Sequence, residues 1–305
     1  ERGDLLANGM AGLFTGTTGL KTAQTALNTT AHNLSNINTS GYTRQQVTFS
    51  DTQYVRVNTS DKVSSPDYGL GVAVSEVRRI RDQFIDQAYR NENSRLGFYE
   101  SQYKAIEEIE DQFGEMQGVT YESYLINLYN SVNELAKNPT STVARSSLIQ
   151  NATAFIEKSE NVYKGLKDYQ TTLNTQVKNM VDSINKLGDK IYTLNKKISK
   201  IESTGIEDAN DLRDERDAAI DELSKYIDIT YYENDSKEVI ISAEGIPFVT
   251  MGELAKMDTR VVEGTNLVIP TWPGYERDVY DLSTEASNVD ETDKGELKGI
   301  LIARG

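Results

Sequence analysis

The sequence predicts an α+β protein that is elongated and divided into several domains. Three observations indicate this class: a long heptad repeat of apolar residues, a later stretch in which apolar and polar residues alternate, and an apolar fraction of only 37 %. Globular domains usually contain roughly 45–50 % apolar residues when glycine is counted, so we expect a thin core. The length of 305 residues indicates about two domains.

The composition excludes several kinds of site. The chain has no cysteine, which excludes disulfides, zinc–thiolate sites and a cysteine nucleophile, and its single histidine, His32, cannot form a multi-histidine metal site. The net charge of −15 disfavours contact with phosphate backbones, so no nucleic-acid partner is expected. No apolar run approaches the roughly 18 residues of a membrane helix, and no signal peptide is recognisable, so we expect no membrane insertion.

Most of the negative charge lies in the last third of the sequence. Residues up to Thr204 contain 23 acids and 22 bases, and the rest contains 24 acids and 10 bases, which restores the totals of 47 and 32. Such asymmetry indicates a change of domain or of surroundings. We interpret the acidic part as a solvated outer surface.

The first periodic segment predicts an N-terminal helix that lies along another helix. Leucines recur every seven residues from Leu13 to Leu34, and small or β-branched residues follow three positions after each. Glycines and threonines weaken this helix, so it needs an opposing apolar stripe from elsewhere. We place this core helix and its closing turn at 10–41, and we set residues 1–9 aside as a possible expression remnant.

A bundle domain is expected over 42–226, with a β segment over 42–80 and helices over 82–226. The third helix carries a heptad in which apolar residues are spaced alternately by three and four. These bundle-core residues are Val177, Met180, Ile184, Leu187, Ile191, Leu194, Ile198 and Ile201. Because flanking helices offer complementary apolar faces, the repeat favours a long antiparallel helical bundle; an intermolecular coiled coil is the alternative.

After Tyr226 the period changes from helical to alternating, which predicts a smaller β-rich outer domain over 227–293. Glycines and prolines separate its strands. Residues 294–305 predict the start of a helix that returns to the bundle and is cut off by the end of the sequence.

No catalytic template fits the chain. It lacks the phosphate-binding GxxxxGK[ST], zinc-protease HExxH and nucleophile GxSxG motifs. The acidic stretch Asp208–Asp217 lacks the glycine and the final glutamate of a calcium-binding EF-hand loop. We therefore expect a protein that is not an enzyme, with no catalytic, cofactor-binding or metal-binding residues and no cofactor.

A short motif stands out at the end of the N-terminal helix: Asn33-Leu-Ser-Asn36, then Thr39, then Gly41-Tyr-Thr-Arg-Gln45. Two later stretches, Asp211–Asp217 and Gly295–Leu301, are also distinctive. Together these segments resemble the signatures of the bacterial flagellar rod, hook and hook-associated proteins, and in particular the hook-associated branch of that family.

The resemblance implies a structural axial protein of the flagellum, an adaptor at the hook–filament junction that is needed for filament assembly. The implied partners are the hook protein, the second hook–filament junction protein, further copies of the chain in the axial ring, and an export chaperone, although the C-terminal region is missing here. The implied location is extracellular, on the flagellum, after type III export without a cleaved signal peptide. The alternatives are another axial protein, of the hook or rod, and a secreted coiled-coil adhesin or binding module.

The resemblance also assigns roles to residues near the N-terminus. Family members pair N- and C-terminal helices into the inner layer of the axial tube, and four seam residues are assigned to this packing: Leu20, Leu27, Leu34 and Ile37. Five others are expected to shape the bend from the helix into the β segment: Asn33, Asn36, Gly41, Tyr42 and Arg44. At Gly41 a left-handed turn would exclude most other residues.

Overall fold

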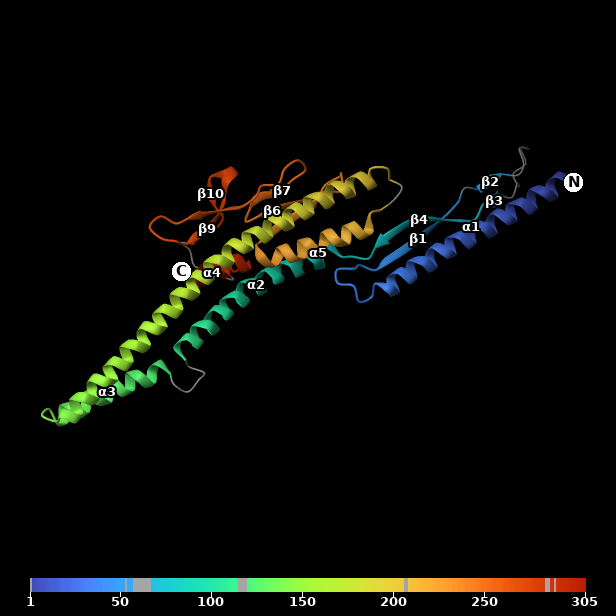
Figure 1. Ribbon diagram of the computed structural model, residues 1–305. Helices are drawn as coiled ribbons and strands as arrows, with labels where there is room; N and C mark the ends of the chain where they lie inside the picture. Colours follow the sequence, from blue (N-terminus) through green and yellow to red (C-terminus); the bar gives the residue numbers. More distant parts are fainter. Residues whose placement is uncertain are drawn as a thin grey trace. The chain divides into compact units, whose positions relative to one another are not determined.

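A computed structural model describes residues 2–52, 54–56, 67–114, 120–205, 208–282, 286–287 and 289–305. The helices in these ranges are α1 (Arg2–Ser35), α2 (Gln83–Phe113), α3 (Tyr121–Lys137), α4 (Thr142–Glu202), α5 (Asn210–Tyr226) and α6 (Glu296–Arg304) (Figure 1). The strands are β1 (Gln45–Asp51), β2 (Tyr54–Arg56), β3 (Asp67–Gly69), β4 (Val72–Arg79), β5 (Ile229–Glu233), β6 (Val239–Ala243), β7 (Ile246–Val249), β8 (Asp258–Val261), β9 (Val268–Trp272) and β10 (Arg277–Asp278). The predicted α+β class is confirmed.

The chain divides into two compact units. The first contains the described part of Glu1–Asp86 together with Thr193–Ala219 and Asn234–Glu238, and the second contains the described parts of Gln87–Tyr192, Ile220–Glu233 and Val239–Gly305. Helices α4 and α5 each contribute to both units. The domains expected from the sequence divide the chain differently from these two units, and their boundaries stay a prediction.

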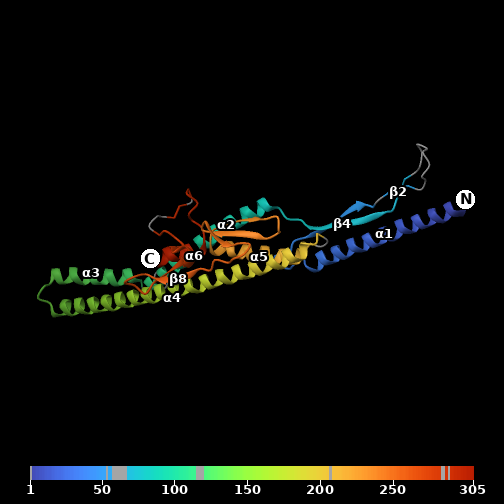
Figure 2. The ribbon, with the colours of Figure 1, turned by 90° about the horizontal axis from the view of Figure 1, so that it is seen from above.

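In the first unit, α1 lies along the antiparallel pair β1–β4 (Figures 1 and 2). The pairing runs from Gln45 opposite Arg79 to Asp51 opposite Val72, and it shifts at a bulge after Thr48. Helix α1 begins at Arg2, so the part of residues 1–9 that the structure describes is helical and continuous with the rest of α1. It ends at Ser35, two residues before Ile37, the last residue of the predicted seam.

The end of α4 and the start of α5 form an antiparallel helix pair within the same unit. Leu194 and Ile198 of α4 are buried with Ala209, and Leu212 packs against them. Arg213 Nη2 lies 2.6 Å from Glu202 Oε2, and this ion pair ties the two helices together beside the connecting loop.

In the second unit, α4 runs antiparallel to α2 and α3 (Figure 1). Gly165 of α4 faces Gln112 at the end of α2, and Tyr121 at the start of α3 lies 3.2 Å from Ser159 between the two hydroxyl oxygens. The ring of Tyr121 also contacts Phe155, with centroids 5.4 Å apart. The predicted antiparallel arrangement therefore holds for these helices.

Helices α5 and α6 run parallel to α2 and lie against its small-residue face. Arg90 of α2 pairs with Asp221 of α5 at 2.6 Å, and Asn93 donates to Ser224 at 3.0 Å. The buried positions of α2 that follow are mostly small: Ser94, Gly97, Ser101 and Ala105. At Gly299 of α6 an added Cβ would lie 2.7 Å from the Phe98 carbonyl oxygen, so the absence of a side chain permits the close approach of α6.

The strands after Tyr226 form two small antiparallel sheets that pack against α4. Their orders are β5–β6–β7 and β10–β9–β8. Phe248 of β7 lies against Gly188, where any side chain on α4 would clash. Asn185 of α4 donates to the Met257 carbonyl at 2.9 Å and accepts the Met257 N–H at 2.9 Å. Helix α4 therefore packs against strands and loops as well as against helices.

The structure buries seven of the eight heptad residues expected in the bundle core. They are Val177, Met180, Ile184, Leu187, Ile191, Leu194 and Ile198, each 9 % exposed or less. The eighth, Ile201, is 37 % exposed, which differs from the expectation. The reason is its position, because α4 ends one residue later at Glu202 and no further turn of helix follows to cover it.

Buried charges meet where β5, the β6–β7 turn and α6 come together. Lys294 Nζ lies 3.6 Å from Asp228 Oδ1, and Lys298 Nζ donates to the Thr292 carbonyl at 2.6 Å. Glu244 Oε1 accepts the Asp228 N–H at 3.3 Å. Burial, together with the neighbouring Asp228 carboxylate, raises the pKa of Glu244 to about 7. Glu244 therefore binds a proton near neutral pH in the folded chain.

The free energy of unfolding of the second unit should decrease as the pH rises through 7. The folded pKa of Glu244, about 7, exceeds its ordinary 4.5, so its contribution is complete below pH 4.5 and is lost as the pH passes 7. The difference corresponds to about 3 kcal/mol at most. Urea unfolding of Glu244→Gln should depend less on pH than that of the unaltered chain, and an unchanged dependence would contradict this assignment.

Truncation of a buried heptad side chain of α4, the stripe from Val177 to Ile198, should destabilise the chain strongly. Ile191 is 0 % exposed, so Ile191→Ala should cost about 2–5 kcal/mol through lost burial and the cavity left behind. Ile149 on the same helix is 66 % exposed, and Ile149→Ala should change stability by no more than about 0.5 kcal/mol. Urea unfolding followed by circular dichroism measures the free energy of unfolding of both variants. Equal losses of stability would contradict the assignment of Ile191 to the core.

Candidate functional site

The motif Asn33–Gln45 forms a closed turn between α1 and β1. The Asn33 side chain bonds both backbone groups of Gln45: Nδ2 donates to the carbonyl at 2.8 Å, and Oδ1 accepts the N–H at 2.9 Å. Asparagine suits this position because its amide carries a donor and an acceptor side by side. The end of α1 is thereby tied to the first residue of β1.

Tyr42 and His32 extend this hydrogen-bond network. The Tyr42 hydroxyl donates to Asn33 Oδ1 at 2.7 Å, and His32 Nδ1 lies 3.0 Å from the same hydroxyl. Since the hydroxyl gives its one proton to Asn33, His32 Nδ1 must be the donor in the second bond. Burial, and secondarily the Asp214 and Asp211 carboxylates, raise the pKa of Tyr42, which keeps its hydroxyl protonated.

Asn36 and Gly41 shape the backbone of the turn. The Asn36 N–H donates to the His32 carbonyl at 3.1 Å, and its Oδ1 accepts the Thr39 hydroxyl at 3.1 Å. Gly41 has φ +80°, the left-handed conformation expected from the sequence. A Cβ at Gly41 would lie 3.1 Å from the Cβ of Ala218 on α5. Both the backbone conformation and the close approach of α5 therefore favour glycine.

Carboxylates at the start of α5 bind the turn and the adjacent strands. Asp214 accepts the Thr43 N–H at 3.0 Å and Arg79 Nη1 at 2.8 Å, and Asp217 accepts the same Arg79 nitrogen at 2.7 Å. The positive end of the helix dipole favours acidic residues in the first turns of α5. The turn, the β1–β4 pair and α5 are thus held by one charged network.

The two distinctive stretches Asn33–Gln45 and Asp211–Asp217 are in direct contact. Besides the bonds of Asp214, Gln45 Nε2 donates to Asp211 Oδ1 at 3.3 Å. Sequence reasoning assigned a bending role to the first stretch and gave Asp214 and Arg79 no role. Their separation of 135 residues explains this, because nothing local in either segment indicates the other.

The seam of α1 points away from this contact. Its residues are Leu20 (72 % exposed), Leu27 (70 %), Leu34 (70 %) and, just after the helix, Ile37 (73 %). The opposite side of α1 holds the strands: Thr22 is buried, and Thr15 and Thr18 each donate to a strand-side carbonyl, those of Gly69 and Leu70, at 3.3 Å. Helix α1 is therefore bound to the strands on one side and exposed to solvent on the other.

Gly71 was not recognised in the sequence as part of this site. Its φ is +106°, and a Cβ there would collide with the Thr18 side chain and lie 3.2 Å from the Thr15 Cα. The available signal was a glycine at the start of a strand-like run, where glycine often marks the close approach of another backbone. Gly71 permits α1 to lie close to the start of β4.

Arg44 lies beside the seam and its side chain is exposed. Its carbonyl accepts the Ile80 N–H at 2.9 Å, which joins the start of the β1–β4 pair to the turn. With Leu34, Ile37 and Phe49 it lines a groove of about 630 Å³ between α1 and β1. The groove has apolar walls and a cation at its edge.

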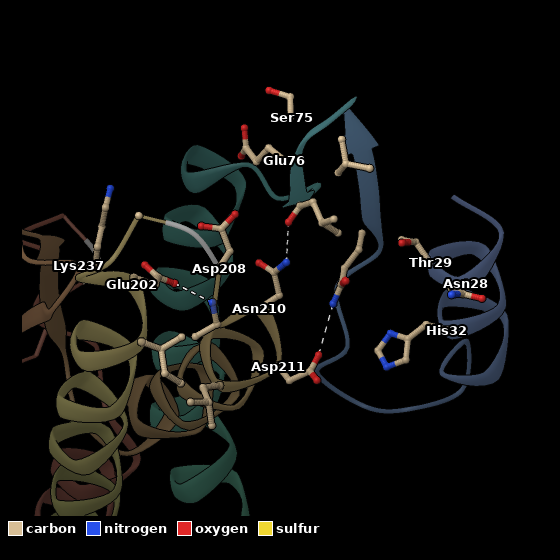
Figure 3. A pocket seen from close by; sticks show the side chains of 17 residues that line it. Asn28, Thr29, His32, Ser75, Glu76, Glu202, Asp208, Asn210, Asp211 and Lys237 are labelled. Atoms are coloured by element: carbon tan, nitrogen blue, oxygen red, sulfur yellow. Dashed lines mark hydrogen bonds between the residues drawn. The ribbon is translucent and has the colours of Figure 1, made fainter. Parts of the chain in front are cut away.

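A second hollow, of about 960 Å³, lies between α1, the β1–β4 pair and the start of α5 (Figure 3). Two of its polar side chains bind backbone groups: Asn210 donates to the Val77 carbonyl at 2.6 Å, and Glu202 accepts the Ala209 N–H at 3.0 Å. Within the described residues, no group of three or more His, Asp or Glu side chains is arranged to hold a metal ion. These two bonds tie α5 to β4 and to the end of α4.

No helix in the described part of the chain combines the length and the hydropathy that a membrane span requires.

Comparisons with known proteins agree with the signatures. A family described as the flagellar hook-associated protein FlgK helical domain matches residues 106–305, and one described as the flagella basal body rod protein matches residues 13–43. The flagellar hook-associated protein 1 of Bacillus subtilis (strain 168) is 32 % identical over 282 residues, which are 92 % of this chain and 53 % of that protein. The protein of the same name from Salmonella typhimurium is 29 % identical over 212 residues, which are 69 % of this chain and 37 % of that protein.

The fold is also that of a solved structure. The flagellar hook junction protein FlgK from Burkholderia pseudomallei aligns with a TM-score of 0.56 and 18 % identity, over 72 % of this chain and 38 % of that one. The chain spans about half the length, or less, of the curated relatives it matches.

These findings define a structural protein of the bacterial flagellum. More narrowly, the chain belongs to the family of the flagellar hook-associated protein FlgK, whose helical domain covers residues 106–305.

Replacement of Asn33 should loosen the turn. Asn33→Ala removes both bonds to Gln45 and should cost about 1–3 kcal/mol locally. Asn33→Asp keeps the shape but loses the donor, so it should also weaken the turn. Hydrogen exchange at the Gln45 amide should accelerate roughly tenfold or more in Asn33→Ala and less in Asn33→Asp, because the aspartate carboxylate can still accept the Gln45 N–H. Asn28→Ala, at an exposed position of the same helix, is the control; equal acceleration there would contradict the role of Asn33.

Proposed function

We propose that the chain is part of a structural axial protein of the flagellum, an adaptor at the hook–filament junction that filament assembly requires. One observation carries the proposal: the N-terminal signature fixes α1 on one side and leaves its apolar seam exposed on the other. The names of the relatives, flagellar hook-associated protein 1 and flagellar hook junction protein FlgK, support the same role.

An exposed seam of this length needs a partner. Leucines at every seventh position form the narrow apolar contact of a helix packed along another helix. An isolated helix gains little stability, and a continuous exposed apolar patch usually marks an interaction site. In the proposed assembly, Leu20, Leu27, Leu34 and Ile37 pack in the inner layer of the tube, against the C-terminal helix of the whole protein and neighbouring copies.

The remaining elements would position that seam. The turn residues Asn33, Asn36, Gly41, Tyr42 and Arg44 set the direction of α1, and the buried heptad residues of α4 stiffen the helical bundle. The sheets formed by β5–β10 belong to the part of the chain that holds most of the net negative charge. We infer that this part faces the outside, where a charged surface stays solvated.

The partners follow from this position. The hook protein would lie below, the second hook–filament junction protein above, and further copies of the chain beside it in the axial ring. An export chaperone would bind the protein before assembly, and export would use the type III pathway without a cleaved signal peptide. The location is then extracellular, and the protein acts by packing rather than by catalysis.

Charges placed in the seam should prevent filament formation. In a strain that lacks this protein, hooks without filaments are expected, and the full-length protein should restore filaments. The variant Leu27→Lys with Leu34→Lys should fail to do so, because lysine is costly in an apolar layer. Electron microscopy of cells measures the outcome, and normal filaments would contradict the role of the seam.

Asn28→Lys is the matched control. Asn28 is also exposed on α1 but lies beside the seam rather than in it, so this variant should restore filaments. Detection of each variant protein in the culture medium separates a failure of assembly from a failure of export.

A further inference from the structure

Residues 2–79 form an arm that the chain connects to α2 through one short link. The arm contains α1 and the strands β1 to β4, and residues 80–82 lead from β4 into α2 without belonging to a helix or a strand. Among the arm residues whose burial the structure describes, only Thr22 is buried. No apolar side chain in that described part is buried against α5, so the direction of the arm depends on polar contacts.

Two arginines at the base of the arm lie between three carboxylates. Arg79 Nη1 lies 2.8 Å from Asp214 Oδ1 and 2.7 Å from Asp217 Oδ2, both on α5. Arg81 Nε lies 2.5 Å from Asp86 Oδ2, and its Nη1 lies 3.5 Å from the same Asp217 oxygen. The five side chains are 8–19 % exposed, so salt and water screen these pairs less than they screen pairs on the surface.

Arg79, Asp214 and Asp217, which we call the clamp, hold the base of the arm at a defined place on α5. Arg79 is the last residue of β4 and lies opposite Gln45, the first residue of β1. Its two carboxylate partners are three residues apart and therefore lie on the same side of α5. Because one nitrogen of Arg79 binds both of them, a rotation of the arm would break at least one bond. Arg78, the preceding residue, points to the other face of β4 and is exposed.

On one side of the joint, the space between the arm and α5 is not packed. The hollow of about 960 Å³ has Asn28 and His32 of α1 on one wall and Asp211 and Leu212 of α5 on the other (Figure 3). Packed interiors contain few voids larger than a water molecule, so this hollow is not part of a core. The described side chains therefore leave room for the arm to rotate in that direction about residues 80–82.

We propose that residues 80–82 form a hinge and that the clamp fixes the angle at which the arm leaves α5. With the clamp closed, the arm and the adjoining ends of α4 and α5 form one compact unit. With the clamp open, the arm keeps its own hydrogen bonds but takes a range of angles. The inference rests on the proposed axial role and deepens it, because in a symmetric assembly the seam of α1 must point the same way in every copy. Arg79 is then a positioning residue for the seam.

Pulsed electron spin resonance tests the clamp directly, because the chain has no cysteine and can be spin-labelled at chosen positions. Labels are placed at two exposed positions, Gln24→Cys on α1 and Lys197→Cys on α4. The unaltered clamp should give one narrow distribution of distances. Arg79→Gln should broaden this distribution at least about twofold. Arg79→Lys keeps the charge but lacks the planar guanidinium, so it should give an intermediate width.

Arg78→Gln is the matched control and should leave the distribution unchanged. A second pair of labels within the arm, Gln24→Cys with Ser75→Cys, shows whether the arm itself stays folded. If Arg79→Gln disturbs that pair, Asp217→Asn replaces it as the test, because it opens the clamp without changing the arm. A distribution that stays narrow when the clamp is opened in a folded arm would overturn the proposal, and so would equal broadening by Arg78→Gln.

Assembly in cells provides the second test. In a strain that lacks the protein, full-length Arg79→Gln should restore several-fold fewer filaments than Arg78→Gln, when both variants are found in the culture medium in equal amounts. Normal filaments with Arg79→Gln would overturn its positioning role. If even the unaltered protein restores no filaments, the proposed function fails, and the distance distributions of the unassembled chain still decide whether the hinge exists.

Discussion

Helix α4 is 61 residues long, and little of its stability comes from its own propensity, since helices in proteins are stabilised chiefly by burial of one face. That face is the stripe from Val177 to Ile198, and the parts of the chain that pack on it include helices, strands and the loop at Met257. Because the stripe repeats every seven residues, a helix that packs along it needs a matching spacing. The packing against α4 is tight at Gly165 and Gly188, because side chains of α2 and β7 occupy the space where a Cβ would lie.

Close approach at glycine residues also fixes the N-terminal turn. There, glycine at 41 and 71 lets one backbone approach another element, and polar side chains then bind the backbone groups that become accessible. The Asn33 side-chain amide binds the backbone groups of Gln45 as a peptide group of a neighbouring strand would. Asp214 pairs with Arg79 and also accepts the Thr43 N–H. Close approach through glycine and satisfaction of buried polar groups thus act together, because a buried amide without a partner would be costly.

The sequence was informative where a property is local or periodic. The heptad of α4, the end of α1 near Asn36, the left-handed Gly41 and the strands after Tyr226 all have such signals. The signals fail at helix ends and over long separations. Ile201 continues the period but has nothing beyond it to cover it, and Asp214 gives no sign that its partner is Arg79. The buried face of α2 has no apolar stripe that the sequence could reveal, because most of its buried residues are small.

The exposed seam of α1 and the charge of the chain have to be considered together. A protein with a bare apolar seam on α1 would aggregate in solution if its surface were otherwise neutral. A net charge of −15 opposes nonspecific association of copies, and it does so at every relative orientation. Only an orientation that brings a basic surface onto an acidic one escapes this repulsion. Association of copies is therefore selective, because it is unfavourable in general and favourable only where complementary surfaces meet.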